Sequence, residues 1–293
     1  MRNSATGPEA AAQPGYEAAA ARHATRAAAA AKVRVELTGD LSELNAAAQF
    51  FARVWRTPEG QPPLGTDVLR AIVHAGGAVH IARGSSGVAG ACAAIFRPPA
   101  ARGAYSLIAA AQSSDRGVGF ALKQAQRAWA LEHGTASMMW TFDPLVSRNA
   151  RFNLVKLGAV GIEYAVDFYG RLGDGIDGQD ETDRLTARWS LTGPRAAAAA
   201  AGRYAEVTGP DLGRAELYPR RAPDGGPLAA HDGAARWCRV PADIVAIRRH
   251  DPPVAAQWRV AVREVLLPAF ADGFTATGMS RDGWYRLTRE ELP

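Results

Sequence analysis

Residues 105–121, YSLIAAAQSSDRGVGFA, decide the fold of this chain. Residues 105–111 predict a strand, and residues 118–133 predict a long helix that stops at Gly134. Between them lies a short turn with Gly117 and Gly119, which let a phosphate approach the backbone closely. Such a turn aims several N–H groups at one point, where the helix dipole adds positive charge. The stretch predicts an α/β fold with an anion site, although the same glycines would also suit a plain tight turn.

Two common phosphate-binding motifs do not fit this turn. A dinucleotide-binding motif needs a third glycine, where the sequence has Phe120-Ala121-Leu122, and an acidic residue that closes a later strand. A Walker loop needs Gly-Lys-Ser/Thr, which is absent from the turn. The turn therefore calls for another class of phosphate-bearing ligand.

The turn is similar to the CoA-binding motif of GNAT N-acyltransferases, Gln/Arg-x-x-Gly-x-Gly/Ala. Arg116-x-x-Gly119-x-Ala121 matches it, and a second register, Ser114-x-x-Gly117-x-Gly119, keeps the glycine pair without the basic first residue. The resemblance continues through WTFDP at residues 140–144 and SRNARFNLVKLGA at residues 147–159, and it covers residues 32–192. It implies a mixed, splayed sheet flanked by helices, followed by a C-terminal α+β extension.

The same resemblance implies an activity and a ligand. Acyl-CoA, of the acetyl or succinyl type, would be the co-substrate, and a primary amine of a small molecule such as an amino acid would accept the acyl group directly. The residues implied in CoA binding lie on the strand, in the turn and in the following motif: Ala109, Ala111, Arg116, Gly117, Val118, Gly119, Phe120, Ala121 and Asn149.

Two residues depart from the family pattern. Many GNAT enzymes have a tyrosine acid where this chain has Leu154, and Asp115 places a negative charge beside the expected pyrophosphate. A catalytically degenerate CoA-binding or regulatory protein is therefore the main alternative. A protein N-acyltransferase, with the extension holding the substrate chain, is a third.

Four residues are candidates for catalysis and substrate binding. Asp143 is either a base for the acceptor amine or part of an Asp-Pro turn. Tyr169 is either an acid for the CoA thiolate or a packing tyrosine. Arg148 and Arg151 lie three apart on a predicted helix, where they either bind a substrate carboxylate or face solvent.

The chain divides into three predicted parts. Residues 1–31 are rich in alanine and poor in large apolar side chains, so we expect a disordered tail with at most a transient helix. Residues 32–192 form the predicted acyltransferase domain. Residues 193–293 form the extension, with a helix over 254–271 and strands near 274–277 and 284–287. A weak internal echo is one interpretation, with a strand at 244–247 and Asp251-Pro252 repeating the pattern at 138–144.

Composition and charge pattern limit the kinds of partner that we expect. Arginine and acidic residues alternate along most of the chain despite the net charge of +5, so we expect no nucleic-acid partner. Cys92 and Cys238 are too few and too distant for a zinc site or a disulfide framework, and no metal is expected. No segment approaches the roughly 20 apolar residues that span a bilayer. These features predict a cytoplasmic protein without a membrane partner, whose oligomeric state stays open.

Overall fold

A computed structural model of the chain describes residues 14–58, 61–112, 117–170 and 180–289. The chain folds into two compact units. The first unit contains residues 1–139 and 190–201, and the second contains residues 140–189 and 202–293. This division does not follow the predicted boundary at residues 192 and 193. The acyltransferase domain over residues 32–192 therefore stays a prediction that rests on a resemblance.

The sheet of the first unit has the strand order β1-β2-β3-β4-β5. Its strands are β1 (Arg34–Leu37), β2 (Ala78–Gly84), β3 (Gly87–Phe96), β4 (Gly103–Ala111) and β5 (Ser137–Phe142), which continues into the second unit after Met139. The first four pair antiparallel, whereas β5 runs parallel to β4. Among the described residues, the β4–β5 ladder ends at Tyr105 and Met139, although both strands continue. The sheet is thus mixed, and β4 and β5 pair over only a short length.

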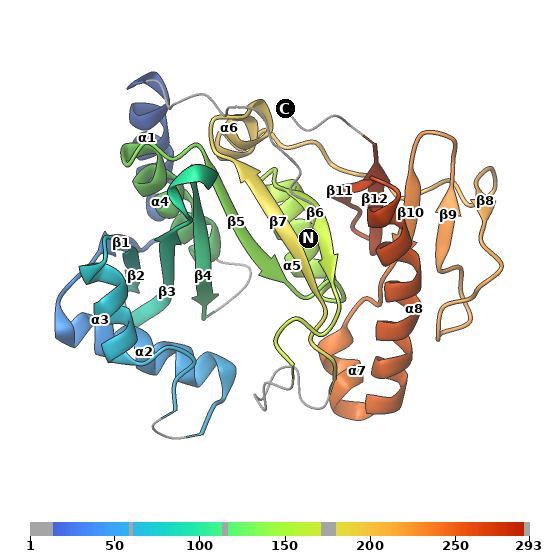
Figure 1. Cartoon of the computed structure of the whole chain (residues 1–293), viewed down its shortest axis with the longest axis horizontal. Helices are drawn as coiled ribbons and strands as arrows, with labels where there is room; N and C mark the ends of the chain where they lie inside the picture. The colour runs from blue at the N-terminus through green and yellow to red at the C-terminus, as the bar shows by residue number, and fades with distance from the viewer. Residues whose placement is uncertain (1–13, 59–60, 113–116, 171–179, 290–293) are drawn as a thin grey trace. The chain divides into compact units, whose positions relative to one another are not determined.

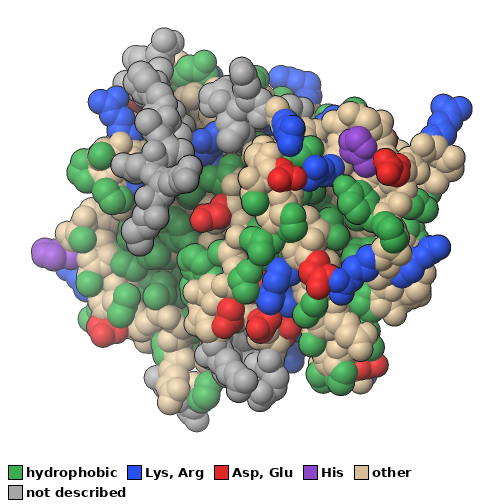
Figure 2. All heavy atoms as spheres, turned by 45° about the vertical axis from the view of Figure 1, so that its right-hand side comes forward, with side chains coloured by type: hydrophobic (Ala, Val, Ile, Leu, Met, Phe, Trp, Pro, Cys, Tyr) green, Lys and Arg blue, Asp and Glu red, His purple; other side chains and the backbone are tan. Residues whose placement is uncertain are grey.

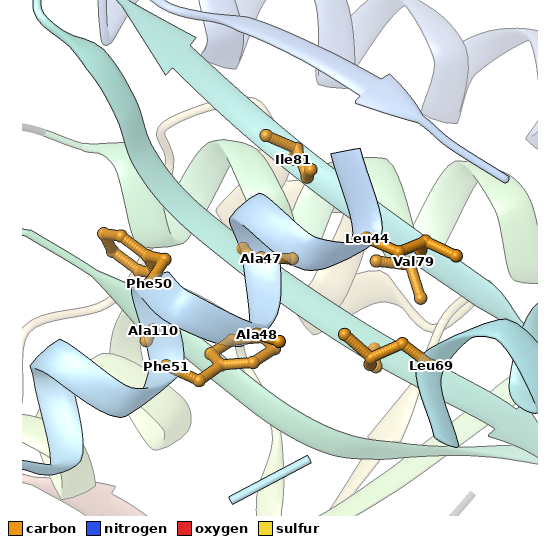
Figure 3. Close-up of a cluster of buried hydrophobic side chains, with 11 residues drawn as sticks. Leu44, Ala47, Ala48, Phe50, Phe51, Leu69, Val79, Ile81 and Ala110 are labelled. Atoms are coloured by element: carbon orange, nitrogen blue, oxygen red, sulfur yellow. The ribbon is translucent and has the colours of Figure 1, made fainter. Parts of the chain in front are cut away.

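Two helices, α2 (Leu41–Trp55) and α3 (Thr66–His74), cover one face of this sheet (Figure 1). Asp40 starts α2, because its carboxylate accepts the N–H groups of Ser42 and Glu43. The buried side chains of α2 recur at helical spacing and pack on Leu69 of α3 and on alternate residues of β2 and β3 (Figure 3). The members of this cluster are Leu44, Ala47, Ala48, Phe50, Phe51, Leu69, Val79, Ile81, Ala91, Ala93 and Ala110.

The other face carries α4 (Val118–Glu132), whose Val118 and Leu122 pack on Ala82 and Cys92. These sheet residues alternate with those under α2, so they lie on the opposite side of the pleat. The same unit also contains the short helices η1 (Pro99–Ala101) and α6 (Pro194–Ala200).

The prediction of a disordered tail over residues 1–31 is wrong for residues 14–30. They form the helix α1 (Pro14–Ala30), which packs along α4. Ala20 and Ala27 lie two turns apart on one face and are buried. An isolated helix of this length is marginal in water. Here its small side chains allow close packing on α4. Because the segment lacks large apolar residues, its sequence did not predict this packing. Residues 1–13 lie outside the described residues.

The strands of the second unit follow the order β7-β6-β11-β12-β10-β9-β8. They are β6 (Val160–Ala165), β7 (Arg184–Ser190), β8 (Glu216–Leu217), β9 (Ala229–His231), β10 (Arg236–Arg239), β11 (Thr275–Met279) and β12 (Trp284–Thr288). The described helices of this unit are α5 (Ser147–Arg151), the π-helical turn η2 (Phe152–Lys156), α7 (Ile244–His250) and α8 (Pro252–Ala271). The helix over 254–271 and both final strands were predicted, with boundaries shifted by a few residues.

Strand β11 brings the C-terminal residues onto β6. Ala276 pairs with Gly161, where an added Cβ would lie only 3.0 Å from that of Ala276. Glycine is therefore needed at residue 161 for the two strands to approach. The internal echo is wrong, because residues 244–250 form a helix that Asp243 caps through the N–H of Ala246.

Candidate functional site

The start of α4 provides the predicted anion site. Gly117 precedes the helix with φ +77°, a backbone conformation that glycine adopts readily. No described side chain caps the first turn, so the N–H groups of Val118, Gly119 and Phe120 have no cap partner among the described side chains. The N–H of Ala121 donates instead to Gly117 O at 2.9 Å. The geometry therefore offers three amides at the positive end of a fifteen-residue helix.

This geometry changes the role predicted for Ala121. Its side chain is fully buried and its N–H is used within the helix, so it contributes close packing rather than a donor. Arg116, Asp115 and Ser114 lie outside the described residues, and the choice between the two motif registers stays open.

The carboxyl-terminal half of β4 leads into this turn. Ala109 is exposed and Ala111 is half-buried, and their partners on β3 are Cys92 and Gly90. Because the β4–β5 ladder ends at Tyr105 among the described residues, the described ladder partners of β4 beyond that point all lie on β3. An extended chain with amide groups, such as pantetheine, could pair with a strand of this kind.

Asp143 follows β5, and its surroundings disfavour the role of a base. Its carboxylate is buried and accepts hydrogen bonds from the Leu145 N–H at 2.9 Å and from Arg259 Nη1 at 2.9 Å. Arg248 Nη2 binds its other oxygen. Burial alone would raise the pKa of Asp143, but Arg259 and Arg248 hold it well below its usual range. A carboxylate held ionised by two guanidinium groups is a poor base. The alternative of a structural Asp-Pro turn fits this geometry.

Tyr169 is exposed rather than half-buried in packing. Its hydroxyl lies 3.1 Å from Oγ1 of Thr141, which is in β5 two residues before Asp143. The guanidinium of Arg184 lies 5.3 Å from the centre of the Tyr169 ring, and Phe168 packs edge-on against it. Thr141 and Tyr169 therefore form a pair of hydroxyl groups, which we call the hydroxyl pair.

The predicted helix that carries Arg148 and Arg151 is present as α5, but the two arginines lie in different surroundings. Arg148 and Asn149 are exposed. Arg151 is mostly buried and binds Glu206 at 2.8 Å, a carboxylate that Arg281 also binds at 2.8 Å. The last turn, η2, is π-helical, a feature often found at functional sites. Carboxylate binding by Arg148 and Arg151 stays a prediction, with Arg151 already engaged by an acid of the chain.

The structure thus gathers the predicted residues in two groups. Ala109, Ala111 and residues 117–121 belong to the first unit, whereas Asp143, Arg148, Asn149, Arg151 and Tyr169 belong to the second. Sequence reasoning missed the second unit's buried arginines, Arg248 and Arg259. Their acidic partner Asp143 lies more than 100 residues away in the chain, so no local pattern marks the pairs.

Charges on the visible surface are mixed. Lys and Arg side chains lie interspersed with Asp and Glu on the face shown in Figure 2. Among the described residues, no group of three His, Cys, Asp or Glu side chains is arranged to hold a metal ion. None of the described helices is long and apolar enough to cross a membrane.

The structure has a mixed α/β fold: a splayed sheet flanked by helices, with a C-terminal α+β extension. No protein-family profile matches the chain, and no curated protein does. Among solved structures, it is similar to an N-acetyltransferase from Staphylococcus aureus Mu50, at 14% identity, covering 55% of this chain and 99% of that one, with a TM-score of 0.44.

Two further solved structures are similar to this chain to a comparable degree. One is a protein from Salmonella typhimurium assigned as an acetyltransferase, with its cofactor acetyl-CoA, at 12% identity, covering 55% of this chain and 94% of that one, with a TM-score of 0.45. The other is the ribosomal-protein-S18-alanine N-acetyltransferase from Escherichia coli, at 12% identity, covering 55% and 95%, with a TM-score of 0.43.

Proposed function

We propose that this protein is an acyl-CoA-dependent N-acyltransferase that binds the CoA pyrophosphate at the start of α4. The observation that carries the proposal is the first turn of α4. Its three amides lack a cap from any described side chain and follow a glycine with positive φ, and α4 is the next described element after β4. A doubly charged pyrophosphate is the kind of ligand that such a turn stabilises.

The rest of CoA would follow β4, with Ala109 and Ala111 beneath pantetheine. Acyl-CoA supplies an activated thioester, whose carbonyl a neutral amine can attack. We assign the proton for the departing thiolate to the Tyr169 hydroxyl, since it is exposed and held by Thr141 rather than buried. Asp143 is not proposed as the base, because two arginines hold its charge.

For the acceptor we propose the primary amine of a small molecule that also carries a carboxylate, such as an amino acid. Arg148 is exposed at the start of α5 and is the candidate for pairing with that carboxylate. Arg151 would join it only after releasing Glu206. Either an acetyl or a succinyl donor is compatible with these residues.

A CoA-binding protein without catalysis is the second candidate. Leu154, in the place of the usual tyrosine acid, is buried in η2 and cannot be replaced there by a neighbouring hydroxyl of the same turn. Thiol release separates the two candidates. An enzyme releases free CoA thiol only when acyl-CoA and a suitable amine are both present, whereas a binding protein shows tight CoA binding and no turnover with any amine.

The anion site has a direct test in Gly119→Glu. The new carboxylate would sit in the first turn of α4, and like charges across a binding surface cost several kcal/mol, so CoA affinity should fall at least about tenfold. Calorimetric titration with CoA measures this loss. Ala125→Glu adds the same charge to a half-buried site later in α4 and is the control. Unchanged affinity in a folded Gly119→Glu protein would overturn the assignment.

A further inference from the structure

The second unit contains a short segment, rich in acidic residues, that binds arginines of α7 and α8. We call Asp180, Glu181, Thr182 and Asp183 the acid segment. Asp180 accepts hydrogen bonds from Arg248 Nε at 3.0 Å and from Arg259 Nη2 at 2.9 Å, and all three side chains are nearly excluded from solvent. Arg259 and Arg248 bind Asp143 as well, so the same two guanidinium groups join the end of β5 to the acid segment.

Arg263 holds the other end of the acid segment. It lies one helical turn after Arg259, on the same face of α8. Its Nε and Nη2 donate to the two carboxylate oxygens of Asp183 at 2.9 and 2.7 Å, a bidentate geometry that fixes direction as well as distance. It also binds Glu181. Asp183 itself accepts the Tyr164 hydroxyl and the N–H of Asp167.

The acid segment in turn holds the turn that carries Tyr169. Thr182 Oγ1 accepts the Tyr169 N–H at 3.0 Å and donates to Gly170 O at 2.9 Å. The N–H of Phe168 donates to Thr182 O at 3.0 Å, and Asp167 accepts the N–H of Thr182 at 3.1 Å. The backbone and the side chain of Thr182 thus both bind the turn at residues 167–170.

We propose that Arg259 and Arg263 of α8, together with Arg248 of α7, are positioning residues for Tyr169. They fix the acid segment, which fixes the turn at residues 167–170, and they fix Asp143, two residues after Thr141. Both members of the hydroxyl pair are therefore held from the C-terminal part of the chain. The role of this part is to set the geometry of the proposed acid. This inference rests on the proposed function for its effect on turnover, but its structural half stands without it.

Arg263 is the residue to test, because Arg259→Ala would leave two buried carboxylates short of a partner and threaten the fold. In Arg263→Ala the amides of Phe168 and Tyr169 should exchange with solvent faster, by tenfold or more, because their acceptor Thr182 loses its support. Hydrogen exchange followed by mass spectrometry or NMR measures this. Arg263→Lys keeps the charge without the bidentate geometry and should rescue exchange protection only in part. Arg236→Ala, which removes a pair with Asp272 in the same unit, is the matched control.

Turnover gives the second arm. Arg263→Ala should lower kcat by roughly tenfold or more, as misplaced catalytic groups do, while KM for acyl-CoA stays within about twofold. Tyr169→Phe should lower kcat by about a hundredfold, and adding Arg263→Ala to it should have little further effect, because both changes remove the same group's contribution.

The exchange and turnover measurements distinguish a failure of this inference from a failure of the proposed function. If no amine supports turnover, the proposed function fails and the exchange measurement alone decides the inference. Unchanged exchange at Phe168 and Tyr169 in folded Arg263→Ala would overturn it. With turnover present, a full and additive loss of kcat in the Tyr169→Phe background would overturn it as well, because Arg263 would then act independently of Tyr169.

Discussion

Burial acts differently on three titratable side chains of the first unit and on an ion pair of the second unit. In the first unit, burial lowers the pKa of His80 to about 4 and that of Lys123 to about 7, and it raises the pKa of the Cys92 thiol to about 12. Each shift favours the neutral form. In the second unit, burial alone would raise the pKa of Asp143 and lower that of Arg259, which would also favour the neutral forms. Each side chain is instead paired with an opposite charge, and both stay ionised.

The contrast follows from partners rather than from depth. Lys123 is a buried residue of α4 and donates to a neutral acceptor, Ser106 Oγ, at 2.9 Å. Its removal from water is the main cause of its lowered pKa. Arg259 binds two carboxylates with hydrogen bonds of 2.9 Å. A buried charge survives where its desolvation is matched by a counter-charge with good geometry. Three substitutions test this contrast, from the largest expected effect to the smallest.

Removing Arg259 should have the largest effect. Arg259→Ala leaves Asp143 and Asp180 buried with only Arg248 to compensate them, and breaking a buried pair of this kind costs about 3–5 kcal/mol of unfolding free energy. Urea denaturation at pH 7 measures it. The loss should shrink at low pH, where the stranded carboxylates can take up protons. A loss below about 1 kcal/mol would show that the buried network contributes no more than a surface pair.

Lys123 should give the first unit a distinct pH dependence. The pKa of Lys123 is about 7 in the folded chain against an ordinary value of 10.5. Between these values the unfolded chain binds a proton that the folded chain does not, so stability should rise with pH by up to about 1.4 kcal/mol per pH unit. Lys123→Met removes this slope. Denaturation of both proteins between pH 7 and 8.5 compares them, and parallel curves would contradict the neutral lysine.

The surface pair of Arg236 and Asp272 should give the smallest effect. The side chains remain 29% and 50% exposed, so solvent and salt screen their attraction. Arg236→Ala should lower the unfolding free energy by about 1 kcal/mol or less. The same denaturation experiment checks it, repeated at high salt, where the loss should diminish. A loss comparable to that of Arg259→Ala would show that burial does not set how strongly these ion pairs stabilise the fold.

Local signals predicted the first unit's turns better than its packing. The turn at Gly117 and the helix stop at Gly134 are marked by glycines, and both have positive φ in the structure. The alanines of α1 carry no such mark, because small residues pack well only against a suitable partner surface. Their partner α4 lies about 100 residues away, and a sequence pattern does not identify it.

The candidate site was predictable only in part, for the same reason. The amides of α4 follow from the turn and the helix, both of which are local. Asp143 was predicted to be either a base or a turn residue. Arg248 and Arg259 disfavour the role of a base, and both lie too far away in the sequence for a local pattern to identify them. Tyr169 is held through Thr182, which lies beyond the residues 171–179 that fall outside the described part of the chain.

The path of the chain between units limits how the protein can be shortened. The chain leaves the first unit after residue 139, returns at 190, and leaves again after 201. A product that ends at residue 192 would keep β6 without β11 on its edge, and Asp143 without either arginine. An uncovered strand edge invites association between copies, and a stranded buried carboxylate weakens the fold. Residues 193–293 are therefore no removable accessory, and any shorter relative that retains β6 must supply its own cover and counter-charge.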